Sequence, residues 1–433
     1  MEERKSILDS KYWQRALEFL FAACIMLGAL GDSKSLPLSL KVLSLLTIAL
    51  GFIVLLVSGD FRRLKKVGSF FGVYGFVLLG ILVWSVFLWI MNLETVSFIA
   101  RGTLKFMYQF FVLLIISAGV YMLGERAIHG TFYGLVAANI IIVLIAVPKF
   151  GIADSVNSFI HFFVSFGEQQ GLMRELEIHD ITFTYGFFLI YFLFFAKRGK
   201  ERIIDIIISV IFFIIGWKRI ALGALPVAIL IGFSLGFMKS RTRIMIMNAI
   251  CWIAILFGFG YVLFIRYDIF NLVMSFFNID TMGRNEVYDY IQRYYEISVT
   301  FIGYGFEYTT VLLQNIMNNF PELKIGVVAL HNNILTVYIE LGFLGFWAWL
   351  IYTWLFQYRW LINHHGEKVA MLFIMCELYI FITYTTDNTL YYYWTSMVLR
   401  LMPMAYAMHM PEHNDQFYWP WIKSKIFNRG LEL

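Results

Sequence analysis

Long uninterrupted apolar segments dominate this sequence and limit what it can fold into. Most are close to the ~20 residues that an α-helix needs to cross roughly 30 Å of hydrocarbon. The chain is 60% hydrophobic and 15% charged, whereas soluble proteins carry about 25% charged residues. Within a bilayer, backbone polar groups must bond to one another, and these segments lack the alternation of β-barrel strands. The sequence therefore predicts an all-α polytopic membrane protein.

Twelve apolar segments are predicted to span the membrane, namely residues 13–30, 37–58, 68–91, 106–123, 131–147, 181–196, 203–216, 220–238, 244–265, 333–355, 369–386 and 389–410. Lysine and arginine gather in every second connection, for example at 62–66, 197–202 and 239–243. Cytoplasmic loops carry this excess of positive charge. We therefore expect a single membrane domain over 1–433, with a retained first helix and both termini in the cytoplasm.

Two of the predicted external connections are long. Residues 148–180 include a stretch typical of an interfacial amphipathic helix. Residues 266–330 form the longest polar segment and lie between the ninth and tenth predicted spans. Because the external side holds most of the polar chain, we expect chemistry on that side.

Composition argues against several other functions. The net charge is +5, carried by loop lysines and arginines, and no basic patch typical of nucleic-acid binding occurs. The three cysteines lie inside apolar segments, so neither a disulfide nor a metal site is expected: Cys24, Cys251 and Cys376. No nucleotide-binding loop, zinc motif or carboxylate pair with glycosidase spacing is found.

The first candidate site lies at Lys218 and Arg219, in a short external connection. Two positive charges on that side run against the positive-inside rule. They can be side chains that extend to lipid headgroups, or they can bind an anionic lipid phosphate, which suits the guanidinium fork.

The second candidate lies at 280–295 in the longest polar segment. Asp280 or Thr281 can cap a helix, which places Arg284 in a first turn whose N–H groups favour anions. Arg293 follows on the same segment. The alternative is an ordinary surface helix with one apolar face, formed by Val287, Tyr288, Ile291 and Tyr295.

The third candidate is His331, at the mouth of the tenth predicted span. Asn332 or Asn333 can cap that helix, but capping does not require the histidine. Histidine can accept a proton near neutral pH, although a histidine at a helix mouth can also be a satisfied interfacial residue. Gly342 lies eleven residues further, close to three helical turns, so we expect it to leave a groove below His331.

Three charged residues fall inside predicted spans: Glu340, Glu377 and Arg400. Charges within a membrane are candidates for function, and one of the two glutamates can pair with Arg400. The sequence does not decide which.

These residues resemble a known family. Residues 303–307 read Gly-Tyr-Gly-Phe-Glu, 331–335 read His-Asn-Asn-Ile-Leu and 340–345 read Glu-Leu-Gly-Phe-Leu-Gly. Together they are similar to the core signature of the O-antigen polymerase and ligase superfamily, including the spacing between its histidine and glycine. Arg219 and Arg284 match the places of the family's two arginines. The resemblance covers about residues 215–350.

The resemblance implies a Wzy-type polysaccharide polymerase in a bacterial plasma membrane, acting on the external face without a metal or other cofactor. Its implied partners are a glycan donor and an acceptor linked to undecaprenyl pyrophosphate, membrane lipids and a chain-length regulator. It also implies that Arg219 and Arg284 bind the pyrophosphate and that His331 engages the acceptor hydroxyl. Lys218, Arg293, Asn332 and Gly342 are further candidates for substrate binding.

Other functions remain open. An O-antigen ligase and a protein O-oligosaccharyltransferase face the same pyrophosphate chemistry. A flippase or other transporter of lipid-linked oligosaccharides has the same span layout, and Arg400 is the main feature that favours transport.

Overall fold

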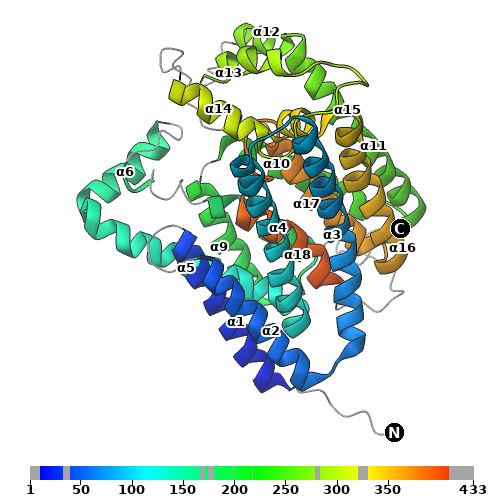
Figure 1. Ribbon diagram of the computed structural model, residues 1–433. Helices are drawn as coiled ribbons and strands as arrows, with labels where there is room; N and C mark the ends of the chain where they lie inside the picture. The colour runs from blue at the N-terminus through cyan, green and yellow to red at the C-terminus, as the bar shows by residue number, and fades with distance from the viewer. Residues whose placement is uncertain are drawn as a thin grey trace, which may run out of the picture.

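The computed structural model describes residues 10–32, 40–165, 171–173, 180–197, 199–216, 218–277, 283–319 and 330–408. Within these ranges 86% of the residues are helical and no strand occurs, as the apolar segments predict. The helices form a bundle, and a group of short helices lies across one end of it (Figure 1).

Seven helical segments are long and apolar enough to cross a membrane. They correspond to α1 (Lys11–Asp32), α3 (Phe61–Met91), α4 (Val96–Leu123), α5 (Arg126–Phe150), α10 (Arg219–Phe237), α11 (Ser240–Arg266), and the segment formed by α15 (Asn333–Ile351), the π-helical η5 (Tyr352–Phe356) and α16 (Gln357–His365). The membrane class is therefore confirmed.

The other five predicted spans correspond to helices outside this set: α2 (Leu40–Ser58), α8 (Thr184–Phe194), α9 (Lys200–Gly216), α17 (Glu367–Thr383) and α18 (Tyr393–Ala407). α17 is buried along most of its length, between α10, α11, α16, α8 and α18. Such a helix is shielded from lipid by its neighbours. The count of twelve and the sidedness of the chain stay predictions.

The longest polar segment folds into short helices at one end of the bundle, the top in Figure 1. They are α12 (Ile269–Phe276), α13 (Arg284–Ile291), η3 (Gln292–Tyr294) and α14 (Tyr308–Asn319). We call this the site end. The segment 148–180 contains the expected helix, α6 (Ile152–Val164), and the turn η2 (Asp180–Phe183) precedes α8.

Gly342 interrupts α15, where its backbone has φ 72° and ψ −177°. A break inside a membrane helix exposes carbonyl groups that lipid cannot satisfy. Here the 303–307 motif supplies donors, because the Tyr304 and Gly305 N–H groups bond to the Ile339 and Glu340 carbonyls at 3.3 and 2.8 Å. On the other side, the indole N–H of Trp84 donates to the Leu341 carbonyl at 2.9 Å.

Gly342 also lets two backbones approach closely. A Cβ on Gly342 would lie 2.1 Å from the carbonyl carbon of Ile302, and the next residue, Phe343, donates its N–H to the Phe301 carbonyl at 2.8 Å. The space where we expected a groove is therefore filled by the backbone of the loop before the 303–307 motif. Helical spacing alone could not show this, because the helix does not continue through Gly342.

We predict that Gly342→Ala strongly destabilises the protein. A side chain there combines positive φ, which costs about 1–2 kcal/mol, with a clash against backbone, which costs about 1–3 kcal/mol. The measurement is the Tm of the protein purified in detergent. Gly260→Ala in α11 is the control, since nothing lies within 4 Å of its added Cβ. Equal melting of the two variants would contradict this account of the break.

Candidate functional site

The connection between α17 and α18, residues 384–392, joins the elements that carry the predicted site. The N–H of Asn333, the first residue of α15, donates to the Tyr384 carbonyl at 2.8 Å. Its side-chain oxygen accepts from the Leu390 N–H at 2.9 Å. From α11, the Tyr261 hydroxyl donates to the Thr385 carbonyl at 2.7 Å. The connection is thus fixed at the site end.

His331 faces this connection. Its Nδ1 lies 3.9 Å from Oδ1 of Asp387 and 3.5 Å from Nδ2 of Asn388. The side chain is 40% exposed, and its backbone adopts φ 49°, a conformation that non-glycine residues rarely occupy. The structure therefore holds an accessible histidine beside a carboxylate.

Helix α15 starts just after His331 because Asn332 caps its N-terminus. The side-chain oxygen of Asn332 accepts the N–H of Leu335 at 3.0 Å, so it is the cap of α15. Its amide group donates to the Tyr288 hydroxyl of α13 at 3.2 Å. The predicted capping is confirmed, and it also links His331 to the helix that begins with Arg284.

The side chain of Asp387 is 14% exposed, and its surroundings favour the ionised carboxylate. Burial acts to raise its pKa, but the His331 side chain, the positive charge of Lys218 and hydrogen bonds outweigh it, and the net pKa lies below the ordinary value of 3.8. Those bonds come from the Tyr392 hydroxyl at 2.6 Å and the Asn388 N–H at 2.7 Å. The carboxylate beside His331 is therefore stabilised in its charged form.

Arg284 is the first residue of α13, and it reaches the same connection. Its guanidinium donates to the Thr386 carbonyl at 3.2 Å, while its Nε is buried with no hydrogen-bond partner in the described residues. Gly283, in the left-handed conformation, precedes the helix. The proposed caps Asp280 and Thr281 lie outside the described residues. The predicted apolar face is confirmed, since Val287, Tyr288, Ile291 and Tyr295 are all buried.

The other basic candidate residues differ in their surroundings. Lys218 precedes α10, lies over the ring of Phe183 at 5.5 Å and acts electrostatically on Asp387. Arg219 follows it as the exposed first residue of α10. Arg293 in η3 lies over the ring of Tyr290 at 5.6 Å. The structure therefore brings Lys218, Arg284 and His331 to one connection, with Arg219 adjacent to Lys218.

A second ionic cluster joins α4 to the 303–307 motif. Glu307 is 7% exposed and has φ 74°. Lys105 Nζ lies 2.5 Å from its carboxylate and Arg101 Nε lies 4.0 Å away. Both cationic side chains are nearly half exposed. Sequence reasoning overlooked this cluster, because Glu307 and the α4 cations are about 200 residues apart.

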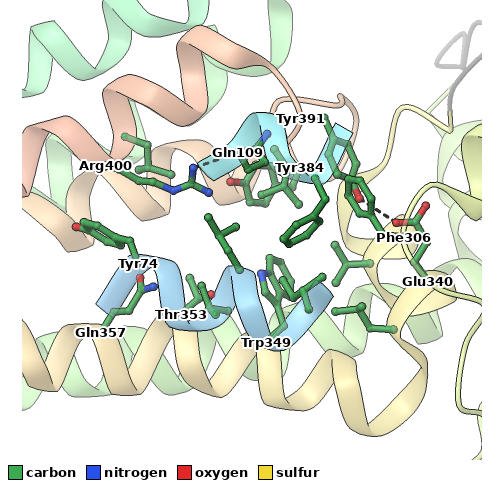
Figure 2. Close-up of a pocket in the computed structure, with 18 of the residues that line it drawn as sticks. Tyr74, Gln109, Phe306, Glu340, Trp349, Thr353, Gln357, Tyr384, Tyr391 and Arg400 are labelled. Atoms are coloured by element: carbon green, nitrogen blue, oxygen red, sulfur yellow. Dashed lines mark hydrogen bonds between the residues drawn. The ribbon is translucent and has the colours of Figure 1, made fainter. Parts of the chain in front are cut away.

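The three charged residues that fall inside predicted spans, Glu340, Glu377 and Arg400, line a small cavity (Figure 2). Glu340 accepts hydrogen bonds from Thr309, at 2.8 Å for the hydroxyl, and from the Tyr391 hydroxyl at 3.2 Å. Arg400 donates to Gln109 at 3.1 Å and forms no ion pair with Glu340 or with Glu377, which also lines the cavity. Of the two glutamates, Glu377 is the one that interacts electrostatically with Arg400, without a direct ion pair.

This cavity holds about 100 Å³. Because one water needs about 10–15 Å³ of such space, the cavity can contain several waters. Among the described residues, no three His, Cys, Asp or Glu side chains are grouped as metal ligands are.

Comparisons with known proteins assign no family. No protein-family model matches the chain, and a search of curated proteins finds no match. A function must therefore be argued from the site itself.

Sequence analysis missed Asp387 and Asn388. The predicted spans 369–386 and 389–410 left almost no connection between them, although the polar run Thr-Thr-Asp-Asn-Thr over residues 385–389 marks one. Its proximity to His331, 56 residues earlier, depends on tertiary packing. A polar run between two apolar segments is the signal that could have found it.

We predict that Lys218→Ala raises the pKa of Asp387, because it removes a positive charge that favours the carboxylate. In the wild type, the stability that ionised Asp387 contributes is lost only as pH falls through its lowered folded pKa. In the variant, that loss should begin at higher pH. The measurement is the pH titration of the carboxylate infrared band assigned by difference with Asp387→Asn. Lys149→Ala, at the end of α5, should leave the titration unchanged, and an unshifted band in Lys218→Ala would refute the assignment.

Proposed function

We propose that this protein is an O-antigen or capsular polysaccharide polymerase. It would transfer a glycan from undecaprenyl pyrophosphate onto a lipid-linked repeat unit at the external face of a bacterial plasma membrane. The observation that carries the proposal is the meeting of Arg284, His331, Asp387 and Lys218 at one end of a helical membrane bundle. The resemblance of residues 303–345 to the polymerase and ligase signature supports it.

The basic residues suit the leaving group. Breaking the bond between sugar and diphosphate places negative charge on the diphosphate, and positioned cations stabilise that charge. Arg284 offers a half-buried guanidinium in a first helical turn, and Lys218 and Arg219 begin α10. The guanidinium fork binds phosphate oxygens in pairs. In the proposal, these three residues bind the donor pyrophosphate.

His331 and Asp387 suit the acceptor. The Nδ1 of His331 faces Asp387 and Asn388, so Nε2 is the nitrogen available to a hydroxyl. The acceptor oxygen forms a bond to the anomeric carbon, its proton passes to Nε2, and the bond to the pyrophosphate breaks. Asp387 orients the ring and stabilises the imidazolium.

An apolar groove supports a lipid-linked substrate. It lies between α3 and α15, holds about 400 Å³ and is lined by residues that include Phe76, Gly80, Trp84, Leu344 and Gly345. Leu344 is 61% exposed. In the proposal, this groove binds a polyprenyl chain. It lies beside the break at Gly342 and not at Gly342 itself.

The proposal predicts that His331→Ala abolishes chain growth while the protein accumulates normally. Loss of a general base lowers a rate by roughly 10²–10⁴-fold. The measurement is polymer length after purified protein is mixed with a lipid-linked donor and acceptor. His364→Ala, at the opposite end of the bundle, is the control. Elongation by His331→Ala at the wild-type rate would exclude the assigned role, and absence of elongation by the wild type would favour a transporter.

The proposal also predicts different results for two replacements of Arg284. Arg284→Lys keeps a charge but loses the fork, so it should retain part of the activity, whereas Arg284→Ala should lose roughly 10²-fold or more, as for removal of one donor to a developing oxyanion. Single-turnover elongation measures the difference. If both variants elongate like wild type, Arg284 does not bind the leaving group.

A ligase or a protein O-oligosaccharyltransferase would use the same cations. The acceptor distinguishes them, and a deletion strain reports it. One repeat unit on the lipid core identifies a lost polymerase, core without any repeat identifies a lost ligase, and unglycosylated target protein identifies the oligosaccharyltransferase.

A further inference from the structure

The ionic cluster that joins α4 to the 303–307 motif takes no part in the proposed transfer step. Its two cations, Arg101 and Lys105, are four residues apart on α4, and residues at this spacing share one face of a helix. The carboxylate of Glu307 lies 2.5 Å from Nζ of Lys105 and 4.0 Å from Nε of Arg101. A buried carboxylate thus holds two cations side by side at the site end.

Both cations remain accessible to a ligand. The side chain of Arg101 is 41% exposed, and that of Lys105 is 46% exposed. In the described part of the chain, Glu307 is the one group that pairs with either side chain. A guanidinium group carries five N–H donors and an ammonium group carries three. Most of these donors can therefore meet the oxygens of an anion.

The apolar groove between α3 and α15 reaches the motif that holds these cations. Trp84 lines the groove, and the next residue, Ser85, accepts the Phe306 N–H at 3.1 Å. From α4, a Cβ on Gly102 would lie 3.5 Å from the Phe306 carbonyl oxygen. Glu307 directly follows Phe306. One end of the groove therefore adjoins the ionic cluster.

The connection between α17 and α18 contacts both this cluster and the candidate site, through different residues. Asp387 faces His331 at 3.9 Å. The ring of Tyr391 lies 5.6 Å from the ring of Phe306, the residue before Glu307. The two cationic clusters are therefore distinct, and one connection links them.

The proposed reaction brings together two substrates that each carry a pyrophosphate. The donor loses its pyrophosphate, so the developing charge must be stabilised where the bond breaks. The acceptor keeps its pyrophosphate, which is attached at the opposite end of its repeat unit from the hydroxyl that reacts. The second pyrophosphate therefore needs a cationic site of its own, away from His331.

We propose that Arg101 and Lys105 bind the pyrophosphate of the lipid-linked acceptor and that the groove between α3 and α15 holds its polyprenyl chain. The guanidinium fork meets two oxygens of one phosphate, and the ammonium group acts as a point charge on the other. Glu307 is a positioning residue, because it orients Lys105 without touching substrate. The name of the acceptor rests on the proposed function, whereas binding of a polyprenyl pyrophosphate at this cluster does not.

The number of polyprenyl pyrophosphates that one chain binds tests the proposal without catalysis. Native mass spectrometry of the purified full-length chain would count bound undecaprenyl pyrophosphate, with undecaprenol and phosphatidylglycerol as comparison lipids. The variants are Arg101→Gln alone and Arg101→Gln with Lys105→Gln. The single variant keeps the pair between Lys105 and Glu307, so it tests the site even if the double variant loses stability. The control is Lys149→Gln, an exposed cation at the end of α5.

We expect the wild type and the control to bind two molecules of undecaprenyl pyrophosphate, and the double variant to bind one. Arg284→Ala should also bind one, at the acceptor site, and the combination of all three substitutions should bind none. Losing one hydrogen bond to a charged group is worth roughly tenfold in affinity. Arg101→Gln alone should therefore weaken one of the two sites about tenfold.

Elongation kinetics then identify the substrate at the cluster. Arg101→Gln should raise the KM for the lipid-linked acceptor about tenfold, the expected loss for one charged hydrogen bond. Its kcat and its KM for the donor should equal those of the wild type. An acceptor whose repeat unit is attached to a neutral alkyl chain should show the same KM in both proteins, because it has no pyrophosphate to lose contact with.

Two bound molecules at wild-type affinity in Arg101→Gln would overturn the proposal. Equal competition by phosphatidylglycerol would also overturn it and would identify a general headgroup site. A raised KM for the donor would overturn the assignment to the acceptor. If the cluster variants lose one molecule but the wild type elongates no chain, the binding site stands and the proposed function fails. Normal elongation with unchanged binding in the variants gives the opposite conclusion.

Discussion

The break in α15 at Gly342 is the constraint on which the site end depends. A helix interrupted within a membrane segment leaves carbonyl groups that lipid cannot satisfy. Donors from Tyr304, Gly305 and Trp84 meet the three carbonyls that precede Gly342. The broken helix needs these hydrogen bonds, and two of them come from the longest polar segment. They therefore fix where the short helices of that segment lie relative to the bundle.

Helices α13 and α15 in turn fix the residues of the candidate site. His331 directly precedes the cap of α15, and Asn333 bonds at both ends of the α17–α18 connection. Arg284 bonds to that connection from α13. Groups on loops become precise when helices and buried hydrogen bonds hold the loops. These bonds join the long polar segment to the α17–α18 connection, and so they fix the position of His331 relative to Asp387.

The sequence predicts these features unevenly, for physical reasons. Apolar length identifies α3, α4, α5 and α11 because a membrane imposes that length on any exposed helix. The same criterion predicts too long a helix for α18, which has 15 residues and is largely buried. The role of Gly342 cannot be derived from helical periodicity, since its conformation is set by the backbone of Ile302. The Asp387 partner of His331 likewise requires knowledge of which loops meet.

Carboxylates hold the positive charges of the site end in place. Lys218 acts on Asp387, and Lys105 pairs with Glu307, so these two cations are oriented before any ligand arrives. Positively charged groups that are oriented in advance stabilise a charge-separated state better than groups that must first reorganise. The carboxylates of the site end are therefore as important to its electrostatics as the cations that the sequence pointed to.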